Sequence, residues 1–171
     1  MNLMRILPLF LFFLCCSAWK IPEPKSVIYQ YIDRYALRAI NTMHDSQIPA
    51  SIIMAMAIEE SAAGTSEVAR EANNHFGMKG GSSWTQGLYK TKGGSSYRKY
   101  ATVQESYEDF ALLLKNNYKS LFKYTRTDYK NWAYALEKTN YCSRKGYAKR
   151  LLSIIDNHLL YNFDNCILEF K

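Results

Sequence analysis

Two adjacent carboxylates, Glu59 and Glu60, close an apolar stretch of this chain and could do acid–base chemistry. At helical spacing Glu60 falls four residues after Met56 and seven after Ile53, on an apolar stripe, whereas Glu59 continues the row of Ala55. A carboxylate that faces a core or cleft at a helix C-terminus is desolvated and feels the negative end of the helix dipole, and both favour its protonated form. Glu60 is therefore a candidate general acid. A solvated glutamate in the last turn is the alternative.

The segment that carries these carboxylates predicts a helix buried at the centre of a domain. Pro49 is a favourable first helical residue, Gly64 is a stop signal, and the side chains between them are apolar almost all round. Thr65 or Ser66 can then cap a short helix that runs to about residue 71.

The flanking patterns predict further helices and one small sheet. Ser26 can cap a helix over 27–43, with a turn at 44–46. Gly-Gly pairs and aromatic residues between 80 and 96 predict a two- or three-stranded β excursion. Thr102 and Glu105 have the spacing of a capping box. Two later helices are expected over 128–139 and 146–161. The predicted fold class is mainly α, with a small β-hairpin lobe.

Composition limits the classes of function. A chain of 171 residues, 48% hydrophobic and 15% aromatic, fits one packed domain rather than a disordered tail. The formal net charge of +7 suits an anionic partner such as a cell wall, and nucleic acid is less favoured outside the cell interior. His44, His75 and His158 lie in separate segments without ligand spacing, so no metal or other cofactor is expected. His75, between two asparagines and Phe-Gly, reads as a polar turn residue.

The first residues predict export. Arg5, the apolar run 6–14 and the small residues at 16–18 have the order of a secretory signal covering 1–18, and the run is too short to span a bilayer. Cys15 and Cys16 leave lipidation open. A linker at 19–26, a domain at 27–164 and a tail at 165–171 follow. We expect an exported monomer in the periplasm, envelope or medium, without stable membrane insertion after signal cleavage.

Two cysteines, Cys142 and Cys166, remain beyond the signal. They could form a disulfide in an oxidising compartment or stay free thiols, because the sequence does not give their separation. Among the aromatic residues, those on helix faces predict core packing. Trp84 and Tyr89, in the Gly-rich excursion, are the predicted cleft-facing pair for stacking on sugars.

Three separated motifs resemble one known family. They are IPASIIMAMAIEESAAGTSEVAREANNHFGMKG, YRKYATVQESYEDFALLL and NYCSRKGYAKRLLSIID. In this order they resemble the glucosaminidase domains of glycoside hydrolase family 73, which include flagellar peptidoglycan hydrolases and Gram-positive autolysins. The resemblance covers most of the chain, roughly 31–164.

The resemblance implies a lysozyme-like fold that cleaves the β-1,4 bond after N-acetylglucosamine in peptidoglycan glycan strands. It implies that Glu60 is the catalytic acid and that the late family tyrosine falls on Tyr141. The residues implied to bind substrate or shape its cleft are Asn73, Asn74, Phe76 and Tyr147, with Trp84 added as the stacking candidate.

One departure from the family concerns the second carboxylate. Members often carry one on the β lobe, but this chain has no Asp or Glu between Glu71 and Glu105. Glu105 is the nearest candidate, although its capping-box spacing favours a structural role. Without a lobe carboxylate, we expect either the substrate's N-acetyl group or a water held by Tyr141 to attack opposite Glu60. A muramidase, a lytic transglycosylase and a catalytically silent wall-binding module are the alternatives.

Overall fold

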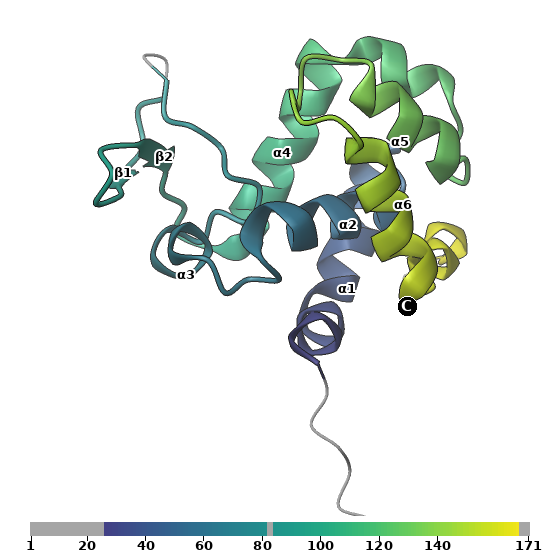
Figure 1. Cartoon of the computed structure of the whole chain (residues 1–171), viewed down its shortest axis with the longest axis horizontal. Helices are drawn as coiled ribbons and strands as arrows, with labels where there is room; N and C mark the ends of the chain where they lie inside the picture. The colour runs from purple at the N-terminus through teal and green to yellow at the C-terminus, as the bar shows by residue number, and fades with distance from the viewer. Residues whose placement is uncertain (1–25, 82–83, 168–171) are drawn as a thin grey trace, which may run out of the picture.

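The structure is a computed structural model that describes residues 26–81 and 84–167, and Figure 1 shows it as a mostly helical molecule with a small lobe at one side. The predicted signal segment and most of the linker lie outside the described residues, so they stay predictions. In chain order the elements are α1 (Val27–Ser46), α2 (Ala50–Ser61), α3 (Glu67–Ala72), β1 (Leu88–Lys90), β2 (Ser96–Arg98), α4 (Val103–Asn117), the 3-10 helix η1 (Lys119–Lys123), α5 (Tyr129–Glu137), α6 (Tyr147–Asn157) and the 3-10 helix η2 (Leu160–Asn165). The predicted mainly helical fold with a hairpin lobe is confirmed.

Helix α2 is the centre of the core. Its residues from Ala50 to Ala57 are fully buried, and α1, α5, α6 and η2 pack around it (Figure 1). A helix that is apolar on every side needs such a cover, because any face left in water would expose hydrophobic side chains. The burial fixes the direction in which the last turn of α2, with its two carboxylates, points.

The start of α2 is fastened by a residue from the far end of the chain. Pro49 is the N-cap and offers no side-chain hydrogen bond, so it precedes the helix instead of opening it as predicted. Asp164 of η2 accepts hydrogen bonds from the backbone N–H and the hydroxyl of Ser51, at 2.8 and 2.7 Å. These bonds satisfy groups that a helix N-terminus leaves unpaired. Burial raises the pKa of Asp164 to about 6.

The end of α2 also differs from the prediction. The helix stops at Ser61, and Ala62, Ala63 and Gly64 all have positive φ, at 52°, 51° and 76°. The Ser61 hydroxyl donates to the carbonyl of Ala57 at 2.5 Å and accepts from the N–H of Gly64 at 2.8 Å. This local hydrogen bonding ends the helix three residues before the glycine that the sequence marked as its stop.

The small lobe is a two-stranded antiparallel hairpin, as predicted. β1 and β2 pair with Tyr89 opposite Tyr97, and an isolated bridge adds Lys79 to Tyr97. The amide group of Asn74 fastens the lobe to the segment after α3. Its nitrogen donates to the carbonyls of Met78 and Arg98 at 2.9 and 2.8 Å, and its oxygen accepts from the N–H of Met78.

The helix limits correct two further predictions. α1 continues to Ser46, so 44–46 is helix rather than turn, because Gln47 in the left-handed region closes it with a hydrogen bond to the Met43 carbonyl. α6 ends at Asn157 instead of 161, where Leu159 with φ 53° breaks the helix before η2. No helix in the ranges 26–81 and 84–167 is long and apolar enough to cross a membrane.

Candidate active site

Glu60 opens into a cleft of about 250 Å³ between the helical body and the segment that leads to the lobe. Its side chain keeps 20% of its surface exposed, so the carboxylate is partly desolvated but reachable. The expectation that it faces a cleft therefore agrees with the geometry. The other residues that line this cleft are Phe76, Gly77, Met78, Lys79, Leu113, Tyr118, Tyr141, Cys142 and Arg144.

Opposing effects set the protonation of Glu60. Burial is the largest of them and raises its pKa above the ordinary value for glutamate. The hydroxyl of Tyr147, which donates to Oε1 at 2.9 Å, and the guanidinium of Arg144 at 3.4 Å favour the charged form and lower the pKa. The charge of Glu59 raises it again. The net upward shift is in the direction that a general acid near neutral pH requires.

Glu59 has a different environment from Glu60, although its side chain is almost equally buried at 17% exposure. Its Oε1 accepts from Nε of Arg150 at 2.8 Å and lies 3.8 Å from Nη1 of Arg144. Glu59 does not line the cleft. Glu59 is thus ion-paired outside the cleft, whereas Glu60 faces the cleft, so the two neighbouring carboxylates are suited to different roles.

Three of the residues singled out from the sequence meet in this cleft: Glu60, Phe76 and Tyr141. Phe76 is buried and stacks on Phe110, with ring centroids 4.0 Å apart and planes inclined by 3°. Tyr141 packs against Tyr147 at 6.2 Å between centroids. Burial and the nearby charge of Glu60 raise the pKa of the Tyr141 hydroxyl, which keeps it protonated and able to donate a hydrogen bond.

Trp84 and Glu105 lie elsewhere, in a separate pocket of about 330 Å³ between the lobe and α4. The indole N–H of Trp84 donates to the carbonyl of Gly87 at 3.0 Å. The backbone N–H of Glu105 donates to the Thr102 hydroxyl, which is one half of the predicted capping box. The Glu105 carboxylate accepts from the N–H of Ala101 at 3.0 Å, one residue before the N-cap, so it has a structural contact at the start of α4. This position is outside the group that surrounds Glu60.

The remaining predicted residues have structural contacts. The amide nitrogen of Asn73 donates to the carbonyls of Tyr100 and Ala101, and Asn74 holds the lobe as described above. Tyr147 has no exposed surface, so its ring cannot stack on a sugar, and its hydroxyl instead orients Glu60. Tyr89, the predicted partner of Trp84, donates to Glu67 at 2.5 Å on another side of the hairpin.

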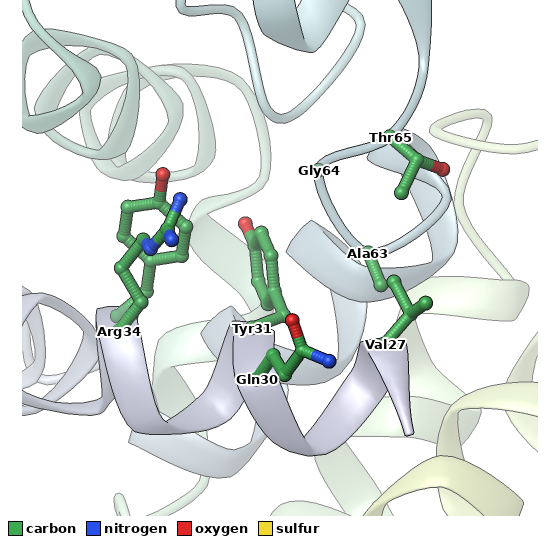
Figure 2. A pocket seen from close by; sticks show the side chains of 8 residues that line it. Val27, Gln30, Tyr31, Arg34, Ala63, Gly64 and Thr65 are labelled. Atoms are coloured by element: carbon green, nitrogen blue, oxygen red, sulfur yellow. The ribbon is translucent and has the colours of Figure 1, made fainter. Parts of the chain in front are cut away.

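His75 is buried rather than being an open polar turn residue. It keeps 3% exposure, and its Nδ1 lies 2.6 Å from the hydroxyl of Tyr31 on α1. Burial lowers the pKa of His75 to about 4, so the ring is neutral at physiological pH. Nothing in the local sequence reveals this partner 44 residues earlier. Tyr31 also lines a second pocket of about 160 Å³, where Figure 2 shows its ring between α1 and the loop that carries Ala63 and Gly64.

Sequence reasoning missed the cations around the carboxylates. Arg144 lies in a segment without a helical pattern, and Arg150 lies in the first turns of α6. Only the tertiary fold brings Arg144 to both carboxylates and Arg150 to Glu59. Both Cys142 and Cys166 are free thiols, so the optional disulfide is absent. Within the described residues, no cluster of three or more His, Cys, Asp or Glu side chains could hold a metal ion.

A partly buried glutamate at the end of a central helix, facing a cleft beside a small hairpin lobe, is an arrangement typical of the lysozyme-like fold. Residues 36–160 match the family described as Glucosaminidase, mannosyl-glycoprotein endo-beta-N-acetylglucosaminidase. The chain belongs to this glucosaminidase family, and the resemblance drawn from its motifs is confirmed.

Known relatives agree with this family. The chain is 35% identical to an N-acetylmuramoyl-L-alanine amidase domain-containing protein of Staphylococcus aureus over 80% of its own length and 25% of the relative. It is 34% identical to exo-glucosaminidase LytG of Bacillus subtilis over 67% of its length and 45% of the relative. It therefore spans less than half of these curated relatives.

Solved structures agree as well. An N-acetylmuramoyl-L-alanine amidase structure from Staphylococcus aureus superposes with a TM-score of 0.71 at 29% identity, covering 86% of this chain and 46% of that one. The glycoside hydrolase domain of Salmonella typhimurium FlgJ gives a TM-score of 0.66 at 26% identity, covering 79% and 90%. The overall fold of this chain is thus similar to that of a known glycoside hydrolase domain.

Proposed function

We propose that this protein is a peptidoglycan hydrolase, an endo-β-N-acetylglucosaminidase that cleaves the β-1,4 bond after N-acetylglucosamine. The observation that carries the proposal is Glu60, a partly buried carboxylate with a raised pKa, in the cleft of a glucosaminidase-family fold. Relatives that are named as a glucosaminidase and as a glycoside hydrolase domain support this reaction class.

In the proposed mechanism Glu60 delivers its proton to the leaving glycosidic oxygen. Tyr147 holds the carboxylate in place through the 2.9 Å hydrogen bond. After the bond breaks, the Glu60 carboxylate is stabilised by the same hydroxyl, which favours its charged form. Tyr147 thus keeps the side chain positioned through both protonation states.

The attacking group does not have an obvious carboxylate partner. Among the described residues that line the cleft, Glu60 is the single Asp or Glu. Glycosidases with two carboxyl groups place them about 5 Å apart for a nucleophile and roughly 6.5 to 9.5 Å apart for a base that activates water. We propose that Tyr141 instead orients the substrate's acetamido group or a water molecule opposite Glu60.

The same observation favours a second candidate, a wall-binding module that holds glycan strands without cutting them. A cleft with one carboxylate has enough polar and aromatic surface to bind a glycan but lacks a second acid–base group. The partial burial of an ionisable acid costs folding stability. A catalytic role for Glu60 would account for this cost, which argues against the binding module.

The setting of the reaction is part of the proposal. The signal pattern at 1–18 supports export, and the net charge of +7 supports attraction to an anionic envelope. We place the protein in the periplasm, the envelope or the medium as a monomer.

Digestion of purified peptidoglycan tests the proposal. Soluble fragments with N-acetylglucosamine at the new reducing end, identified by mass spectrometry after borohydride reduction, are the expected products. Reducing N-acetylmuramic acid would indicate a muramidase, and its anhydro form a lytic transglycosylase. Binding of the polymer without any release of fragments between pH 4 and pH 9 would support the binding module.

A further inference from the structure

Two positively charged side chains line the cleft beside Glu60, and the mechanism above uses neither of them to bind substrate. Lys79 comes from the segment after α3, and Arg144 comes from the segment before α6. Since Glu60 is the single carboxylate among the described cleft residues, this surface has an excess of positive charge. An excess of one sign in a cleft attracts ligand groups of the other sign.

Arg144 makes long contacts with the two carboxylates and also contacts the Cys142 side chain. Its Nη2 lies 3.4 Å from Glu60 and its Nη1 lies 3.8 Å from Glu59, and 56% of the side chain is exposed. Charge-assisted hydrogen bonds are normally about 2.7 to 2.9 Å long. Arg150 makes such a bond to Glu59, at 2.8 Å. Arg144 can therefore turn to another anion without leaving Glu59 unpaired.

Lys79 is also available. Its Nζ lies 3.7 Å above the ring of Tyr97, and within residues 26–81 and 84–167 it makes no ion pair. A lysine ammonium is a mobile point charge, whereas the arginine fork matches the two oxygens of a carboxylate. The two side chains thus supply different kinds of contact to an anion from two segments that line one cleft.

We propose that Arg144 and Lys79 form a binding site for a carboxylate of the glycan substrate, and that filling this site withdraws Arg144 from Glu60. This inference rests on the proposed function, because it assigns a substrate group to the same cleft. In peptidoglycan the carboxylate comes from a stem peptide, or from the lactyl group of muramic acid where the peptide has been removed. Chitin oligosaccharides have the same β-1,4 backbone without any carboxylate.

Withdrawal of Arg144 couples binding to the acid. Arg144 lowers the pKa of Glu60 in the free protein, so its engagement by the substrate lets that pKa rise and favours the protonated acid. The binding energy of the carboxylate is then used to prepare the reacting group. The titratable and charged groups around Glu60 are Glu59 on α2, Lys79 after α3, Tyr118 after α4, Tyr141, Cys142 and Arg144 before α6, and Tyr147 and Arg150 on α6.

Calorimetric binding in a Glu60→Gln background, where no cleavage intervenes, tests the site. The three ligands are glycan strands with stem peptides, strands stripped of peptides by an amidase, and chitin oligosaccharides. Arg144→Gln should raise Kd by about tenfold or more for a carboxylate-bearing ligand, as expected for loss of a hydrogen bond to a charged group, and leave chitin within about twofold. Arg144→Lys should recover part of the loss. Lys145→Gln is the control, because it removes one charge from the same segment outside the cleft.

Each pattern of loss has a meaning. Loss confined to peptide-bearing strands identifies the stem peptide, and loss confined to stripped strands identifies the lactyl group. An unchanged Kd for both ligands, or an equal loss on chitin, overturns the carboxylate site. Cleavage by the unsubstituted protein is measured separately, so Arg144-dependent binding without cleavage would reject the hydrolase and keep the site.

Steady-state kinetics test the withdrawal. In otherwise unsubstituted protein, Arg144→Gln should move the basic limb of kcat/KM to higher pH, because the free protein loses the charge that favours ionised Glu60. On a carboxylate-bearing substrate the basic limb of kcat should stay in place, because Arg144 has already left Glu60 in the complex. Equal shifts of the basic limbs of kcat and of kcat/KM would show that Arg144 stays beside Glu60 in the complex, and would overturn its proposed withdrawal.

Discussion

Tyr147→Phe is the substitution that isolates one contact of the proposed acid. It removes the hydroxyl that donates to Glu60 at 2.9 Å and keeps a buried ring of nearly the same shape. A hydrogen bond to a charged group contributes about 1.5 to 3 kcal/mol, and about 1.4 kcal/mol is a factor of ten in an equilibrium. Ionised Glu60 loses this support, so at a fixed pH the ratio of protonated to ionised Glu60 should rise roughly tenfold or more.

The assay for Tyr147→Phe is the pH dependence of kcat/KM on soluble glycan strands. A general acid works while protonated, so the basic limb should move to higher pH, and activity at alkaline pH should fall less steeply than in the unsubstituted protein. Thermal unfolding of both proteins controls for loss of structure. A basic limb that stays in place, or moves to lower pH, would refute the assignment of Tyr147 and Glu60 as a coupled pair.

The other substitutions test separate parts of the account. Glu59→Gln should keep most activity and move the basic limb of kcat/KM to lower pH, because the charge that raises the pKa of Glu60 is removed; a loss of activity as large as that of a Glu60 variant would contradict this. Tyr141→Phe should slow kcat by about tenfold to a hundredfold on soluble glycan through loss of one positioning hydrogen bond, and an unchanged kcat would remove Tyr141 from the mechanism. Asp164, with its pKa raised from 3.8 to about 6, and His75, with its pKa lowered from 6.5 to about 4, each contribute about 3 kcal/mol to the pH dependence of stability, with opposite signs. Urea unfolding from pH 4 to pH 6 should therefore show stability that rises with pH in Asp164→Asn, where His75 remains, and falls with pH in His75→Gln, where Asp164 remains. Stability curves with the same slope in both variants would show that the two groups do not act in opposite directions.

These signs follow from proton binding. Between pH 3.8 and about 6 the folded protein holds the Asp164 proton more tightly than the unfolded chain, so its contribution to stability is lost as pH rises through the folded pKa. Between about 4 and 6.5 the unfolded chain holds the His75 proton more tightly, so that contribution is present above the unfolded pKa of 6.5 and is lost as pH falls through the folded pKa of about 4.

Local signals were sufficient for the elements of the fold. The apolar residues on every side of α2 predicted its central place. The side chains of four residues cap α1, α3, α4 and α5, namely Ser26, Ser66, Thr102 and Asp128. Helix ends were less predictable. Helix α2 ends before Gly64, because the Ser61 hydroxyl hydrogen-bonds to the backbone on both sides of the turn. A glycine stop signal in the sequence does not show that a nearby serine ends the helix earlier.

The position of Glu60 at the cleft was predictable from the sequence, but the contacts around it were not. Helical spacing placed Glu60 on a stripe that faces inward, and that argument needs one segment only. The contacts of Arg144 and Tyr147 join positions 84 and 87 residues from Glu60, and no local pattern encodes such pairs. Tyr147 illustrates the limit, because its hydroxyl contacts Glu60 while its burial leaves no ring surface to stack on a sugar.

The most direct test of the central claim compares the unsubstituted protein and Glu60→Gln on two substrates. One is soluble peptidoglycan glycan, and the other is a chitooligosaccharide with a dinitrophenyl leaving group, which departs without a proton. If Glu60 is the general acid, Glu60→Gln should lose about a hundred- to ten-thousand-fold in kcat on the glycan and far less on the activated substrate. Equal losses on both substrates, or full activity on the glycan, would contradict the account.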